Sequence, residues 1–271
     1  MLQVAFSYYE LFRDLFGGDD RLFIVSIVWI AYTIPLLLVQ IFLIVIYQFD
    51  FLAKYKLQED ENIDSNMVRK CLKYTLVQHF ITVPCYLYFV GYKTVFIICD
   101  LGPLDSPAWM VLTQLCVWML IEDTIFYWSH RLLHTPTFYK IHKVHHENHN
   151  LTALSIAGEY SHPAESILGN YLPSLFGPCV FRGHFFTLCV WIIIRCLKFC
   201  DAHCGYDFPF SPFGVYPMNS AARHGFHHSA NMGSFGSFTV FWDTVCGTDN
   251  HFEKAQSSKR GTLQKRKKID S

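Results

Sequence analysis

The sequence predicts an all-α fold: an integral membrane helical bundle with a cytosolic, histidine-rich cap for two metals. Three observations predict it. Of the 271 residues, 52% are hydrophobic and only 16% are charged, which is apolar for a soluble protein. The apolar residues gather in runs of about 20 or more, the length that crosses a bilayer. Three short clusters of histidines stand at the end of an apolar run or follow one in the sequence. The length favours one domain, so residues 1–271 are assigned to a single membrane domain, with the histidine clusters within 130–228.

Three apolar runs are expected to cross the membrane. The first is Leu22–Phe51, and the second is Tyr74–Val95. The third begins near Ala108 and should end before Pro136, which disfavours helical geometry in the residue before it. As one helix, Trp109 to His134 would be roughly 39 Å long, against a hydrocarbon core of about 30 Å. The histidines at its end should therefore emerge at the membrane surface.

Basic residues in the loops set the orientation of these runs. The loop after the second run holds only Lys93 before two aspartates. The loop after the first run is rich in basic residues, namely Lys54, Lys56, Arg69, Lys70 and Lys73. We therefore expect the first loop to be cytosolic and the second lumenal, so that the third run returns to the cytosol with its histidines.

A fourth apolar region, Ile167–Phe199, must turn back within the membrane. A single crossing would place the last histidine cluster on the opposite face from the others. Breaks at Gly177-Pro178 and at Arg182-Gly183-His184 favour a re-entrant or hairpin pair of helices. The sequon at Asn150 would then be cytosolic and unmodified. The basic tail, residues 252–271, is expected to be cytosolic and without regular structure. The zero net charge gives no sign of a nucleic-acid partner.

The three histidine clusters are the candidate metal site. Imidazole is a common ligand of transition metals, and helical positions three and four apart share one face. Each cluster is therefore expected to aim its rings at one point. Eight nitrogens are too many for one tetrahedral ion, which indicates two metals with open positions. The eight candidates are His130, His134, His142, His145, His146, His224, His227 and His228.

Further residues are expected to support this site. His203 follows the last apolar run, and topology makes it a ninth candidate ligand. Asp123 lies seven positions before His130 on the same helical face and is the preferred carboxylate partner for a metal-bound ring. His162 is a candidate for a supporting or substrate-gating role. Weaker candidate acids are Glu147, Glu159, Glu165 and Asp243, and the aromatic residues expected near a pocket mouth are Phe126, Tyr127, Trp128 and Tyr160.

The donor set narrows the chemistry. Nitrogen ligands suit iron, zinc and copper. A di-zinc hydrolase should have bridging carboxylates, and none stands inside the clusters. An all-histidine site at a membrane face favours oxygen activation at an unreactive C–H bond. A non-catalytic transporter or scaffold is the alternative, but a transporter should place its ligands near the bilayer midplane. These histidines follow an apolar run and stand beside Arg131, Lys143 and Arg223, which favours the interface.

The residues around the clusters resemble the fatty acid hydroxylase/sterol desaturase superfamily, and within it the methylsterol monooxygenase (C4-methylsterol oxidase) branch. The resemblance covers most of the chain and is weakest in the first fifty residues. The segments that carry it are Ile121–Thr124, His130–His134, His142–Glu147, Glu159–Pro163, Asp201–Asp207, Arg223–His228 and Trp242–Asp249.

The resemblance implies an endoplasmic-reticulum enzyme in which the cluster histidines hold two Fe ions. It implies O2 as oxidant and electrons from NAD(P)H through cytochrome b5 and its reductase. The chain has no His-Pro-Gly-Gly haem motif, so the donor would be a separate protein. The implied reaction is stepwise oxidation of a sterol C4 methyl group to a carboxylate, which a partner decarboxylase removes. Other C4-demethylation enzymes are thus possible partners. A desaturase, another sterol or lipid hydroxylase, or an alkane-forming decarbonylase uses similar clusters and stays open.

Overall fold

In a computed structural model, residues 13–58, 64–102, 104, 106–148 and 154–269 are described. Among these residues, three helical segments are long and apolar enough to cross a membrane. The first is α2 (Asp20–Gln48), and the third is α6 (Ala108–Leu133). The second is a continuous helical segment, Ser65–Ile98. Its parts are α3 (Ser65–Val77), η2 (Gln78–Thr82), α4 (Val83–Tyr86), η3 (Leu87–Gly91) and α5 (Tyr92–Ile98).

Local sequence explains where these segments begin, bend and end. Asp19 caps α2, because its carboxylate accepts from the backbone N–H groups of Arg21 and Leu22. In the second segment, η2 is a π-helical turn just before Pro84, whose ring cannot continue the regular hydrogen-bond ladder. Helix α6 ends at Leu133, before Pro136, as the sequence predicts.

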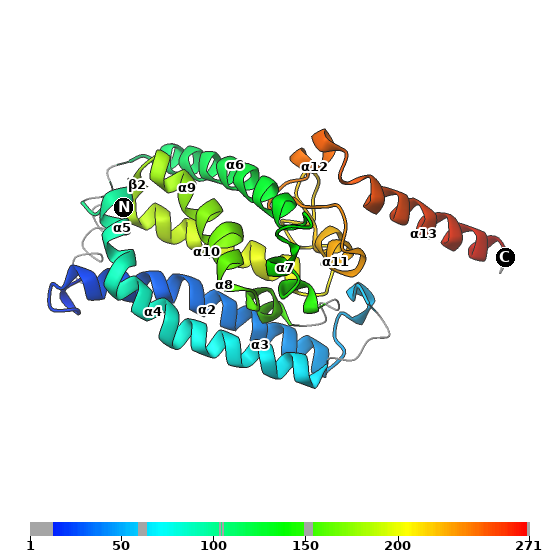
Figure 1. The fold of residues 1–271 in the computed structure, drawn as a ribbon, viewed down its shortest axis with the longest axis horizontal. Helices are drawn as coiled ribbons and strands as arrows, with labels where there is room; N and C mark the ends of the chain where they lie inside the picture. The colour runs from blue at the N-terminus through cyan, green and yellow to red at the C-terminus, as the bar shows by residue number, and fades with distance from the viewer. Residues whose placement is uncertain (1–12, 59–63, 103, 105, 149–153, 270–271) are drawn as a thin grey trace.

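The fourth apolar region is a hairpin of two helical arms (Figure 1). One arm joins α8 (Pro163–Glu165), η6 (Ser166–Tyr171) and α9 (Leu172–Val180). The chain turns at residues 181–184 and returns as α10 (Phe185–His203). At the turn, β2 (Gly183–His184) pairs in parallel with β1 (Cys99–Asp100), which directly follows α5. The turn therefore reaches the same end of the bundle as the loop between the second and third segments, and both arms finish beside the histidines.

The main cluster of buried apolar residues in the bundle draws on α2, α5, α6 and α10, and α9 packs against it. Trp118 of α6 and Trp191 of α10 are fully buried, and their rings meet edge to face at 6.3 Å. Gly177 lets α9 approach α6 closely, because a Cβ there would lie 3.0 Å from the Trp118 Cα. This packing brings the hairpin against α6, the helix that carries His130 and ends at His134.

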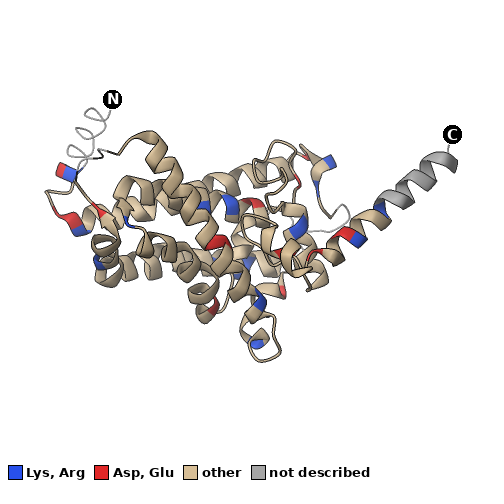
Figure 2. Cartoon of the chain, turned by 90° about the horizontal axis from the view of Figure 1, so that it is seen from above, with Lys and Arg blue, Asp and Glu red and all other residues tan. Residues whose placement is uncertain are grey.

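The outer faces of these segments suit a hydrocarbon environment. Large apolar side chains such as Leu38, Ile97 and Leu112 are more than 60% exposed. In Figure 2, long stretches of the helices carry no charged residue. Because a helix that exposes apolar residues in this way is typical of a lipid-facing span, the bundle has the surface of a membrane protein.

The basic loop after α2 lies at the histidine end of the bundle. It contains η1 (Ala53–Tyr55), and the Leu57 N–H donates to the Gly205 carbonyl at 3.0 Å. At the start of the next segment, Lys70 pairs with Glu147 at 3.0 Å. The first loop and the histidine clusters therefore share one end, as the charge pattern predicts.

The cap is built from short elements. These are α7 (Tyr139–His142), η4 (His145–Glu147), η5 (Ser155–Glu159), α11 (Ala221–Ala230) and α12 (Phe241–Cys246). The tail differs from the expectation: α13 (Asn250–Ile269) is a helix that projects from the cap (Figure 1). Its composition of lysine, glutamine, arginine and leucine favours helix, which explains the difference. The sequon at Asn150 lies outside the described residues.

Candidate metal centre

Two neighbouring groups of histidine nitrogens lie where α6 ends. The larger group takes its members from α6, its C-cap, α7, η4 and α11: His130, His134, His142, His146 and His227. The smaller group takes its members from η4, α10 and α11: His145, His203, His224 and His228. Within each group, one ring nitrogen from every member lies within 4.8 Å of the others. The structure thus brings together all nine histidines that the sequence predicts as metal ligands, including His203.

Each H-x-x-H-H cluster divides its rings between the two groups. His224 and His228, four positions apart, face each other with 3.1 Å between their Nε2 atoms. His227 lies in the other group. Because adjacent helical positions differ by about 100° in direction, His227 and His228 cannot face the same point. The expectation that each cluster aims at one point is therefore wrong for this cluster.

The middle cluster repeats this division in the opposite sense. His142 and His146 belong to the larger group, with 3.0 Å between their Nε2 atoms. His145 belongs to the smaller group and approaches His203, with 3.4 Å between the Nε2 atoms. The rings of His146 and His228 stack across the boundary at 4.7 Å. The two clusters therefore tie both groups into one centre.

The second nitrogen of several rings meets a backbone carbonyl, and this fixes the tautomer. His227 Nδ1 lies 2.6 Å from the Gly233 oxygen, and His203 Nδ1 lies 2.9 Å from the Phe199 oxygen. His130 makes the same contact with Phe235. A carbonyl oxygen can only accept, so Nδ1 carries the proton in each neutral ring and Nε2 presents a lone pair.

Converging lone pairs repel one another unless a cation lies between them. His134 and His227 bring their Nε2 atoms to 3.1 Å, and His203 and His224 bring theirs to 3.0 Å. Two nitrogens that bind one ion at about 2.1 Å lie about 3.0–3.4 Å apart at ordinary coordination angles. The spacing and the tautomers therefore fit one transition-metal ion in each group.

Burial keeps these rings neutral. It lowers the pKa of His134 to about 2, and the other cluster imidazoles contribute in the same direction. Burial likewise lowers the pKa of His224 and of His228 well below the ordinary value. Neutral imidazole is the form that binds metal, so the site is prepared for metal at physiological pH.

A carboxylate does contact one of the candidate ligands, and it is Glu165. Its Oε1 lies 2.7 Å from His142 Nδ1, and both side chains are buried. Sequence reasoning ranked this acid below Asp123. The signal that could have raised its rank is its place at the start of a long apolar region, where an unpaired carboxylate would be costly.

Asp123 and His162 lie elsewhere. The Asp123 carboxylate accepts from the backbone N–H of Thr239 at 3.0 Å and from its hydroxyl, and no contact with a histidine ring is seen among the described residues. His162 is exposed, and its Nδ1 caps α8 by accepting from the Ala164 N–H at 3.1 Å. Asp123 does lie on the same face of α6 as His130, but its carboxylate binds Thr239, in a loop that contacts the histidines.

That loop, residues 233–239, orients two of the rings. It supplies the carbonyl oxygens that accept from His130 and His227. Asp243 holds it by accepting from the Phe235 and Gly236 N–H groups at 2.9 and 2.7 Å. Asp123 holds its far end at Thr239. Asp123 and Asp243 therefore position the rings of His130 and His227 indirectly, by holding the backbone of the loop that these rings contact.

A chamber of about 60 Å³ adjoins the two groups. Members of both groups line it, together with Arg195, Lys198 and Asn219. A larger cavity of about 200 Å³, lined mainly by apolar side chains of α2, the second segment, α9 and α10, lies next to it. Asn170, Arg195 and Phe199 line both spaces. Of the aromatic residues expected near a pocket, only Phe126 lines the chamber.

The comparisons with known proteins agree with this site. The fatty acid hydroxylase family model matches residues 115–248. Methylsterol monooxygenase 1 of Danio rerio is 38% identical over 78% of this chain and 73% of its own length. Methylsterol monooxygenase 2-2 of Arabidopsis thaliana is 34% identical over 77% and 79%. Very-long-chain aldehyde decarbonylase GL1-11 of Oryza sativa subsp. japonica is 34% identical over 78% and 79%. No solved structure matches the chain. The chain therefore belongs to the fatty acid hydroxylase family of oxidoreductases.

Proposed function

We propose that this protein is a membrane di-iron oxygenase that oxidises the C4 methyl group of a sterol. The observation that carries the proposal is the chamber, which touches both histidine groups and shares part of its wall with a mainly apolar cavity. Two Fe ions, when bound, would supply the oxidation of an unactivated C–H bond by O2. In each hydroxylation, one oxygen atom enters the substrate and the other leaves as water, with two electrons from the donor and two protons from solvent.

The chain's own residues hold and orient the reactants. The nine histidines would hold the metals, with Glu165 fixing the ring of His142. The apolar cavity would hold the body of the substrate and exclude water from the chamber, where Phe126 and Leu133 contribute apolar wall. Bulk water is thereby kept away from the reacting carbon, which favours a single outcome of oxidation.

The donor set supports iron and an oxygenase. Both groups consist of histidines alone. A di-zinc hydrolase would use carboxylates as bridges, and the nearest carboxylate, Glu165, lies behind His142 rather than between the groups. A transporter is disfavoured, because the centre lies where α6 ends rather than in the middle of a span.

We further propose that the protein resides in the endoplasmic reticulum membrane, with its site and C-terminus facing the cytosol. Electrons would come from NAD(P)H through cytochrome b5 and its reductase, and other C4-demethylation enzymes would act as partners. Support comes from the basic loop at the histidine end of the bundle, because loops rich in lysine and arginine are enriched on the cytosolic side of membrane proteins.

The rice relatives make an aldehyde-consuming reaction the competing function. The decisive experiment expresses the chain in cells that lack their C4-methylsterol oxidase and profiles sterols by mass spectrometry. Restored 4-demethylation by the native chain, and none by His145→Ala, supports the proposal. Absence of restoration by well-expressed, iron-loaded protein contradicts it, and alkane formation from a long-chain aldehyde would establish the competing function.

A further inference from the structure

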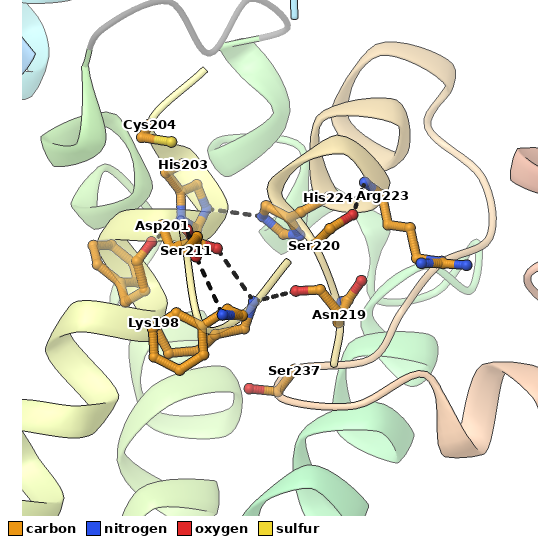
Figure 3. A network of polar contacts seen from close by, with 12 residues as sticks. Lys198, Asp201, His203, Cys204, Ser211, Asn219, Ser220, Arg223, His224 and Ser237 are labelled. Carbon is orange, nitrogen blue, oxygen red and sulfur yellow. Dashed lines mark hydrogen bonds and ion pairs between the residues drawn. The ribbon is translucent and has the colours of Figure 1, made fainter. Parts of the chain in front are cut away.

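The chamber contains buried polar groups that the histidine centre does not use. Lys198 of α10 and Asn219, just before α11, face each other beneath the His203–His224 pair (Figure 3). Lys198 is 2% exposed and Asn219 is 1% exposed. Both line the chamber. Buried polar groups of this kind are unfavourable unless a partner satisfies them.

Lys198 has hydrogen-bond donors to spare. Its ammonium group has three N–H donors and gives one to the Asn219 backbone carbonyl. The nearest carboxylate oxygen, Asp201 Oδ2, lies 3.9 Å away, beyond hydrogen-bond reach. Among the described residues, no further hydrogen-bond partner of this ammonium is recorded. A ligand that offers an oxygen would therefore find a buried cationic donor.

Asn219 has an acceptor to spare. Its Nδ2 donates to the Gly236 carbonyl at 2.6 Å, and this contact fixes the orientation of the amide, because a carbonyl cannot donate. Its Oδ1 is buried and has no hydrogen-bond partner within the part of the chain that the structure describes. A ligand that offers an O–H or N–H would satisfy this oxygen.

Arg195, the other cation that lines the chamber, is already engaged. It forms an ion pair with Glu122 and donates to the Ser174 and Ser237 hydroxyls at 3.0 and 3.3 Å. Its network closes on itself, since Ser237 also donates to Glu122. Lys198 and Asn219 therefore place an unused donor and an unused acceptor side by side in the chamber wall.

We propose that Lys198 and Asn219 bind the hydroxyl group of the substrate and select an alcohol over an aldehyde or a ketone. A hydroxyl oxygen accepts from Lys198 while its proton is donated to Asn219 Oδ1. A carbonyl can only accept, so it leaves Asn219 Oδ1 without a partner. The inference rests on the proposed function and adds to it the group by which the substrate is recognised.

The shape of a sterol agrees with this arrangement. Its hydroxyl carbon is bonded to C4, so the hydroxyl and the C4 methyl lie close together and enter the same chamber. The rest of the molecule is apolar and extends away from the hydroxyl, as the adjoining cavity requires. A substrate bound head first would thus bring its methyl group beneath the histidines.

Three ligands test the proposal on the native, iron-loaded protein in nanodiscs without O2. They are a 4,4-dimethyl sterol, its 3-ketone and its 3-deoxy analogue, each competed against the tritiated sterol. We expect the alcohol to bind about tenfold more tightly than the ketone, and the ketone about tenfold more tightly than the deoxy compound. Equal binding of all three would overturn the proposal.

Two substitutions of Asn219 separate recognition from structure. Asn219→Ala should abolish the preference for alcohol over ketone but keep the preference of both over the deoxy compound, which Lys198 supplies. Asn219→Asp retains an acceptor and should retain the alcohol preference, although it loses the contact with Gly236. Loss of the preference in both variants would assign Asn219 a purely structural role and overturn the proposal. Ser237→Ala, at a chamber residue that is already engaged, should keep the full ranking.

The two proposals can fail separately. If the native protein oxidises the sterol but binds the alcohol and the ketone equally, the hydroxyl site is wrong and the proposed function stands. If the iron-loaded protein binds none of the three ligands and oxidises no sterol, the proposed function itself is overturned.

Discussion

Replacing Glu165 should weaken one metal site and leave the other unchanged. The carboxylate lies 2.7 Å from His142 Nδ1 in a buried pair, so it fixes both the tautomer and the direction of this ring. Loss of such a partner lowers metal affinity by about 10–100-fold, or about 1.4–2.7 kcal/mol. Glu165→Leu should show the full loss. Glu165→Gln keeps an oxygen that accepts from the ring, so its loss of metal affinity should be about 10-fold.

The assay is anaerobic titration of the metal-free protein with Fe(II) against a competing chelator. Because His142 belongs to the larger group alone, one of the two binding steps should weaken and the other should keep its affinity. His162→Ala is the control, since this ring caps α8 and should leave both steps unchanged. Unchanged affinities in Glu165→Leu would refute the argument, and equal weakening of both steps would refute the division into two groups.

Three further predictions follow from the same contacts. Burial lowers the folded-state pKa of His134 and of His224 below 6.5, so below about pH 6.5 only the unfolded chain takes up protons there. The melting temperature of metal-free protein should therefore fall between pH 7 and 5, and a flat or rising profile would contradict this reasoning. Asp243→Ala strands buried N–H groups of the loop 233–239 and should cost about 3 kcal/mol of stability; an unchanged melting temperature in detergent would argue against it. A glycosylation sequon introduced into the loop 101–106 should be modified, whereas native Asn150 should show no mobility shift with glycosidase, and a shift at Asn150 would reverse the assigned orientation.

Much of the fold could be predicted from the sequence because hydrophobic length is a one-dimensional property. The three spanning segments follow directly from it, and the basic loop beside the cap follows from charge. The hairpin of α8–α9 and α10 followed from the number of membrane crossings. A single crossing would have put the last histidine cluster on the opposite face from the first two. Its depth could not be predicted, because it depends on the pairing of Gly183–His184 with Cys99–Asp100, a contact between distant segments.

The sequence predicts which histidines form the candidate site, but it does not predict how they divide between the two groups. A repeated H-x-x-H-H pattern is visible in sequence, and the position of His203 after an apolar run made it a ninth member. The division of each cluster between two groups depends on the 100° step between neighbouring helical residues and on where the facing rings lie. Glu165 was underrated for a similar reason: it contacts His142 across 23 positions, whereas Asp123 only shares a helical face with His130.

The central claim is that two separate histidine groups each hold one metal ion, and metal stoichiometry tests it most directly. His227 and His228 are adjacent in sequence but lie in different groups. The account predicts two Fe per chain in the native protein, with the larger group's ion weakened in His227→Ala and the smaller group's ion weakened in His228→Ala. A native protein that binds a single ion, or none after reconstitution with Fe(II), would contradict it.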